Sequence, residues 1–186
     1  MAPPRINPNA RRDQYGSRIN RAHSPLIAIA LPLATILVSS LTPFLPIISS
    51  VPILPPLGFL FLIAWRLVAP GLLPIWAGAP LGAFDDLFSG QPFGSAILLW
   101  SLAMIAIEVI ETRFPWRGFW QDWITAGCLI AICLLVASLI AGIDLGIVQL
   151  RLIAPQLLLS VLLFPIVARA VASFDRLRLL RFRTID

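Results

Sequence analysis

The sequence contains no lysine, a single histidine and only two cysteines. His23 stands alone at the end of a polar segment, so neither a Ser-His-Asp triad nor a multi-histidine metal site can be built around it. Cys128 and Cys133 are five residues apart in an apolar run, which is not the spacing of a metal or redox motif, and we interpret them as packing residues. We therefore expect no enzyme, no cofactor and no bound metal.

Charge is also scarce. Charged residues make up 12% of the chain and hydrophobic residues 59%, whereas soluble domains have about a quarter and roughly half. With 186 residues the chain is long enough for one ordinary domain. Its polar surface is too small to cover a water-facing fold, so the composition predicts an all-α integral membrane protein.

All fourteen basic residues are arginines, and most of them lie near the two chain ends. No basic patch is interleaved with aromatics as nucleic-acid binding requires, so no nucleic-acid partner is expected. Residues 1–23 combine arginine with Pro, Asn, Ser and Gly, which predicts a disordered cytoplasmic tail. A secretory signal peptide is the alternative, but the apolar run that follows is too long for a signal core. Residues 24–173 form the predicted transmembrane domain, and residues 174–186 a second basic cytoplasmic tail.

The apolar runs, divided at Pro, Gly and charged clusters, give six segments near the length that crosses about 30 Å of hydrocarbon. The second and third are joined only by residues 69–71, so one of them could be shorter and partly re-entrant. The six predicted spans cover residues 25–48, 53–68, 72–89, 93–112, 123–142 and 147–172.

The positions of the arginines predict the orientation of this six-helix bundle. When the six spans alternate across the bilayer, every arginine except Arg151 falls on the side of the two tails. Positively charged segments are retained in the cytoplasm, so both termini are predicted there. Trp116, Trp120 and Trp123 then gather at the inner interface, where indole rings are common.

Prolines and small residues indicate how the helices pack. Pro32, Pro80, Pro155 and Pro165 lie inside predicted spans, and each removes a backbone donor. Lipid tolerates such breaks only where neighbouring helices cover the freed carbonyls, which predicts a compact bundle. Two pairs of small residues at four-residue spacing, Gly78 with Gly82 and Ala30 with Ala34, would allow close approach, either within the bundle or to a partner.

Ionisable residues at membrane depth are costly and are therefore the first candidates for function. Asp85 and Asp86 lie about one turn from the outer end of the third span, and Arg151 lies at matching depth in the sixth. We predict a carboxylate–guanidinium pair between these two helices. Two alternatives stay open: the side chains extend to the headgroups independently, or the carboxylates belong to a proton relay.

A second group lies near the inner end of the fourth span. Glu108 and Glu111 are three residues apart and share a helix face, with Arg169 of the sixth span at similar depth. One interpretation is an interhelix pair with Arg169. The alternative is a cluster of interfacial charges solvated by headgroups, which would also include Arg113, Arg117 and Asp122.

The stretch from Trp65 to Leu102 resembles the MreD family of bacterial rod shape-determining proteins. In that family a helix ends in a glycine-rich stretch with Asp-x-x-Ser-Gly, and a proline and a glycine then open the next helix. The matching residues here are Asp86, Ser89, Gly90, Pro92 and Gly94. Further similarity covers residues 41–178, including an aromatic-Arg pair before Pro70, and Pro165 with the basic end. The long arginine-rich first tail and the Asp85-Asp86 doublet depart from the family pattern.

The resemblance implies a non-catalytic membrane scaffold of the elongation machinery that builds lateral-wall peptidoglycan. It implies binding to a single-span MreC-like protein, and coupling of MreB, indirectly, to RodA and its class B penicillin-binding protein. It also implies a fold similar to the substrate-binding components of energy-coupling-factor transporters.

Two other functions remain open on the sequence. A vitamin-binding component of such a transporter would need a polar outer pocket, and five residues could line one: Asp85, Asp86, Gln91, Gln149 and Arg151. A proton-coupled transporter would need inverted halves and charges at the membrane midplane, and the sequence shows neither.

Overall fold

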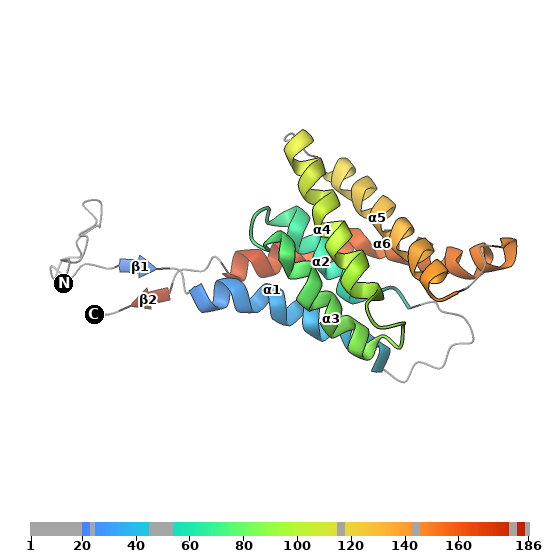
Figure 1. Ribbon diagram of the computed structural model, residues 1–186. Coiled ribbons are helices and arrows are strands. Elements are labelled where there is room, and N and C mark those ends of the chain that lie inside the picture. The colour runs from blue at the N-terminus through green and yellow to red at the C-terminus, as the bar shows by residue number, and fades with distance from the viewer. Residues whose placement is uncertain are drawn as a thin grey trace, which may run out of the picture.

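The structure is a computed structural model, and it describes residues 20–22, 25–44, 54–114, 118–142, 146–178 and 182–184. These residues form six α-helices (Figure 1). Their bounds are α1 Pro25–Ser40, α2 Leu57–Val68, α3 Gly78–Phe88, α4 Ser95–Arg113, α5 Phe119–Ile140 and α6 Ile147–Arg178. Two short 3-10 helices, η1 Thr42–Phe44 and η2 Ile75–Ala77, follow α1 and precede α3. The predicted helix count is confirmed.

The helices differ from the predicted spans mainly in length. Three are long and apolar enough to cross a membrane: Ser95–Arg113, Phe119–Ile140 and, within α6, Gln149–Leu177. The second and third predicted spans shrink to 12 residues in α2 and 11 in α3, about 18 Å or less at 1.5 Å per residue. These two helices are therefore shorter than the predicted segments. Helix α2 begins late because Pro55 and Pro56 precede it, and α3 begins late because Pro70, Gly71 and Pro74 precede it.

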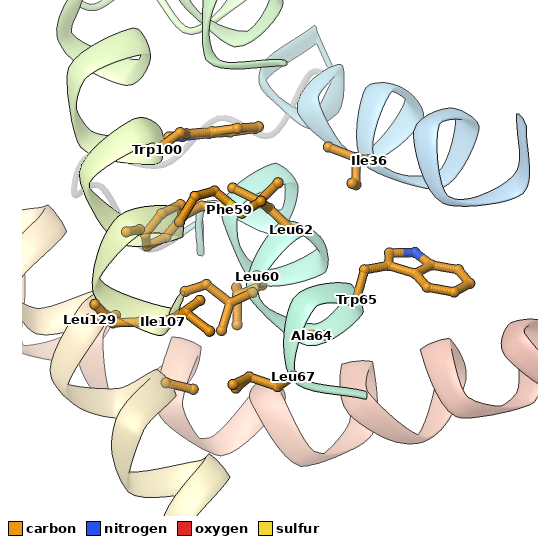
Figure 2. Packing of buried hydrophobic residues seen from close by; sticks show 14 of the residues in the cluster. Ile36, Phe59, Leu60, Leu62, Ala64, Trp65, Leu67, Trp100, Ile107 and Leu129 are labelled. Carbon is orange, nitrogen blue, oxygen red and sulfur yellow. The ribbon is translucent and has the colours of Figure 1, made fainter. Parts of the chain in front are cut away.

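The short α2 forms the centre of the molecule. Nine of its residues are buried, and in Figure 2 helices from both halves of the chain surround it. Phe59 and Trp100 of α4 place their ring centroids 6.1 Å apart, while Ile36 comes from α1 and Leu129 from α5 (Figure 2). A helix that is apolar on all sides requires such a position, because it has no polar face to turn outward.

Close packing of α3 on α4 depends on Gly78 and Gly82. A Cβ atom at Gly78 would lie 2.8 Å from the Trp100 carbonyl oxygen, and one at Gly82 would lie 2.6 Å from that of Ala96. Both glycines face the backbone of α4, which no side-chain movement could relieve. This predicted small-residue pair therefore serves contacts within the bundle, whereas Ala30 and Ala34 of the other pair are exposed on α1.

Side-chain hydrogen bonds join the long helices. Pro165 has no N–H, so it cannot bond the Val161 carbonyl one turn earlier in α6. The indole Nε1 of Trp123 in α5 donates to that carbonyl at 2.9 Å instead. The Gln156 side chain of α6 donates to the Leu54 carbonyl at 2.7 Å, just before α2. The expectation that neighbouring helices cover proline-freed carbonyls is confirmed at Pro165.

The start of α1 and the end of α6 lie on the same side of the molecule (Figure 1). There β1 Asn20–Ala22 pairs antiparallel with β2 Phe182–Thr184. The helix α6 continues to Arg178, beyond the predicted end of its span. The remaining parts of the two predicted tails, with His23, lie outside the described residues.

Candidate functional site: two polar clusters at opposite ends of the bundle

The first cluster is built around Asp86, which is buried in α3 with 5% of its surface exposed. Its carboxylate accepts hydrogen bonds from the backbone N–H groups of Gly94 at 2.9 Å, Ala96 at 2.8 Å and Ile97 at 3.2 Å. The Ser95 hydroxyl donates to it at 3.2 Å. Asp86 therefore caps the N-terminus of α4, whose first N–H groups have no partner within the helix.

The cap comes from another helix because residue 94, which opens α4, is a glycine without a side chain. A carboxylate at this point also meets the positive end of the helix dipole. The Ser95 hydroxyl also lies 3.4 Å from the Gln91 amide oxygen and can donate to it. Asp86 thus ties the end of α3 to the start of α4 across the intervening turn.

The other motif residues form that turn. Gly90 has φ +68° and Gly94 has φ +99°, conformations that residues with a Cβ rarely adopt. The Ser89 N–H donates to the Asp85 carbonyl at 2.8 Å and ends α3, and the Ser95 N–H donates to the Pro92 carbonyl at 3.1 Å. The Asp-x-x-Ser-Gly segment is therefore a helix reversal fixed by two glycines and one carboxylate.

The predicted pair between the Asp85-Asp86 doublet and Arg151 does not form. Asp86 is occupied by the α4 N-terminus, and the Asp85 carboxylate faces Gly58 of α2 and Ser40 of α1. Arg151 is exposed on α6. The prediction compared only the depths of these residues, and a common depth does not fix which way each helix turns its side chains.

The second cluster lies at the opposite end of the bundle. Arg66, in the last turn of α2 and only 3% exposed, forms ion pairs with Glu108 and with Glu111 of α4. The Arg66 Nη2 to Glu111 Oε2 distance is 2.9 Å. Both glutamates lie on one helix face, as their spacing predicted, and the guanidinium also lies near the negative end of the α2 dipole.

The interpretation that Arg169 pairs with these glutamates was wrong. Arg169 is exposed on α6 and lines a pocket of about 340 Å³ with Asp122. Sequence reasoning used Arg66 only to predict orientation and missed its partners. A signal was available, since Arg66 and Glu108 are at similar distances from the ends of their helices on the same side.

Aromatic rings gather near this second cluster, at the start of α5. Trp120 and Trp123 have ring centroids 5.4 Å apart, and Phe119 lies 6.0 Å from Trp120. Trp120 and Trp123 of the predicted tryptophan group thus lie together, while Trp116 and Arg117 lie outside the described residues. Rings at this position are typical of the membrane–water boundary.

An apolar groove of about 510 Å³ runs between α1 and the η2–α3 segment. Pro32, Leu33 and Leu37 form its α1 side, and Trp76, Pro80 and Phe84 lie on the other. Trp76 is 72% exposed. The groove therefore opens on the surface of the bundle, where lipid or another helix can contact it.

A comparison with protein-family models matches residues 21–174, most of the chain, to the rod shape-determining protein MreD. The chain belongs to the MreD family. It is therefore a membrane-embedded protein with a role in determining rod shape, and that family is one of structural membrane proteins. No curated protein and no solved structure matched the chain.

The residues from Asp86 to Gly94 form the turn between α3 and α4, and the Asp86 carboxylate holds the end of α3 against the start of α4. Pro80 and Phe84 of that same α3 line the groove.

Proposed function

We propose that this chain is a non-catalytic scaffold of the rod elongation complex in the bacterial inner membrane, with both termini in the cytoplasm. It binds a single-span MreC-like protein and, through it, links cytoskeletal MreB to RodA and its class B penicillin-binding protein. Family membership supports the role in shape, and the groove between α1 and α3 supports the mode of binding.

The groove suits one apolar helix. Its lining is aliphatic, aromatic and proline side chains. On the α1 side it is flanked by the exposed pair Ala30 and Ala34, and small residues allow two helix backbones to approach closely in lipid. The motif around Asp86 contributes indirectly by holding α3 in place on α4.

The proposal also includes a fold like that of the substrate-binding components of energy-coupling-factor transporters. The alternative function, vitamin binding in such a transporter, needed Asp86 in a polar outer pocket. It draws no support from Asp86, whose carboxylate is occupied by backbone N–H groups of α4.

The proposal is tested by filling the groove. Leu33→Trp places an indole in the groove lining, and affinity capture from detergent-solubilised membranes should then lose the MreC-like protein. Cells that depend on this variant should become round. The matched control is Leu158→Trp on α6, where Leu158 is 65% exposed and outside the groove lining.

Both variants must melt within a few degrees of the unmodified protein, so that lost capture reflects the surface and not the fold. Capture that is unchanged by Leu33→Trp would remove the groove as the binding site. Recovery of no MreC-like protein by the unmodified chain would remove the scaffold proposal itself.

A further inference from the structure

A second pocket, of about 340 Å³, lies at the end of the bundle that carries the Arg66 cluster. The last residues of α2, the first turn of α5 and residues 164–172 of α6 enclose it. Its lining is apolar except for Asp122 of α5 and Arg169 of α6. The groove, by contrast, has no charged residue in its lining, so the two cavities suit different occupants.

The two charged residues of this pocket differ in their surroundings. Asp122 has an interaction within the chain, and its Oδ1 is buried. It also lies in the first turn of α5, near the positive end of that helix dipole. Arg169 is exposed and forms no ion pair within the part of the chain that the structure describes. The pocket therefore offers a guanidinium, and not a carboxylate, to a ligand.

Arg176 adds a second positive charge on the same face of α6. Seven residues separate it from Arg169, which is nearly two helical turns and a rise of about 10 Å. Arg176 is also exposed and makes no ion pair with any described residue. Two guanidinium groups on one helix face attract a ligand of net negative charge, and they repel the ammonium group of a zwitterionic one.

Aromatic rings place this pocket at a membrane surface. Phe119 lines the pocket, and its ring centroid lies 6.4 Å from that of Trp123 and 6.0 Å from that of Trp120. Such rings are common at the boundary between hydrocarbon and water. Helix α6 runs toward this end of the bundle, so Phe164 lies deeper than Arg169. The apolar lining can therefore receive hydrocarbon, while the guanidinium lies at the depth of lipid phosphates.

We propose that this pocket binds an anionic glycerophospholipid of the phosphatidylglycerol class, taken from the surrounding bilayer. The Arg169 guanidinium donates charge-assisted hydrogen bonds to the lipid phosphate. One acyl chain lies along the α6 face at Phe164 and Ala168, and Arg176 adds long-range attraction to the headgroup. The inference is independent of the scaffold proposal, because it needs no protein partner.

The test is native mass spectrometry of the full-length protein in detergent, with equimolar phosphatidylglycerol, phosphatidylethanolamine and phosphatidylcholine of identical acyl chains. Phosphatidylglycerol should be retained several-fold more than either of the other two lipids. Arg169→Gln should remove most of this advantage, whereas Arg176→Gln should remove less, because Arg176 lies outside the pocket lining. Arg113→Gln is the matched control. It changes an exposed arginine at the same end of the bundle, on α4 and outside the pocket lining, and should leave the advantage intact.

The apolar part of the pocket is tested by filling it. Ala168→Trp places an indole in the lining and should lower retention of phosphatidylglycerol although both arginines remain. Its matched control is Ile166→Trp on the same helix, since Ile166 is 62% exposed and outside the lining. Should Ala168→Trp fail to fold, the arginine series still decides the question.

Three outcomes would overturn the inference. The first is equal retention of the three lipids by the unmodified protein. The second is an equal loss of the phosphatidylglycerol advantage in Arg113→Gln and Arg169→Gln, which would mean that any arginine at this surface acts alike. The third is displacement of the lipid by equimolar glycerophosphoglycerol, which has the headgroup without acyl chains and would show that the apolar lining adds nothing.

Discussion

At each end of the bundle, one buried charged residue joins two helices: Asp86 joins α3 to α4, and Arg66 joins α2 to α4. Asp86 makes the larger number of hydrogen bonds. One carboxylate satisfies three backbone N–H groups and a hydroxyl at the start of α4. The neighbouring Asp85 receives none of these bonds, although a sequence reader sees two equivalent aspartates. The two aspartates therefore have different roles: Asp86 caps α4, whereas Asp85 faces α1 and α2.

Asp86→Ala should destabilise the fold by about 3 kcal/mol, because it leaves buried donors without a charged acceptor. The measurement is the free energy of unfolding in mild detergent. Asp85→Ala is the matched control, one position away on the same helix, and should cost clearly less. Equal losses for the two variants would contradict the capping role.

Arg66 carries the second residue-scale prediction. Arg66→Met removes the buried guanidinium that both Glu108 and Glu111 contact, so the unfolding free energy should fall, by up to about 3 kcal/mol because Glu108 is 38% exposed. Adding Glu108→Gln and Glu111→Gln should recover most of that loss, because the two carboxylates that face the missing guanidinium are then neutral amides. Arg113→Met, on exposed Arg113 at the end of α4, serves as control. No recovery in the triple variant would show that packing of the Arg66 side chain matters more than its charge.

At the scale of elements, a neighbouring helix can supply the hydrogen bond that a proline removes. Trp123 of α5 does so for the Val161 carbonyl of α6, one turn before Pro165. Trp123→Phe removes the donor that covers the Val161 carbonyl and should cost about 1–2 kcal/mol of unfolding free energy. In a Pro165→Ala background α6 regains its own N–H for that carbonyl, so the same Trp123→Phe change should cost much less. The double-mutant cycle on thermal unfolding measures this coupling. Additive effects would mean that the indole contributes only by packing.

Helix number and most helix positions could be predicted from the sequence, because apolar run length and proline position are one-dimensional properties. The late start of α3 could not be predicted, because the apolar stretch continues through Pro74, which breaks the helix. The sequence could narrow the partners of each charged residue by their position along the helices, but it could not assign the pairs. Glu108 and Glu111 were recognised as one face, but which arginine meets that face depends on the rotation of α2 and α6 about their own axes.

At the scale of the whole molecule, the proposed orientation makes a prediction about access. In a variant with Cys128 and Cys133 replaced by alanine, a cysteine at Ala2 or at Asp186 should resist a membrane-impermeant maleimide in intact spheroplasts. A cysteine at Phe93, 71% exposed in the turn between α3 and α4, should react. Labelling after lysis shows that each site is reactive once exposed. Modification of either end from outside would contradict the cytoplasmic placement of both termini.

The short α3 has a consequence for the surrounding bilayer. Eleven helical residues rise about 17 Å, against a hydrocarbon thickness of about 30 Å. The central α2 is as short, but protein surrounds it, whereas acyl chains beside α3 meet a reduced apolar height. Lipid there must compress or tilt, at a modest elastic cost for each ångström of mismatch. The protein should therefore partition toward thinner membrane, and a neighbour that covers the α3 side would relieve the deformation.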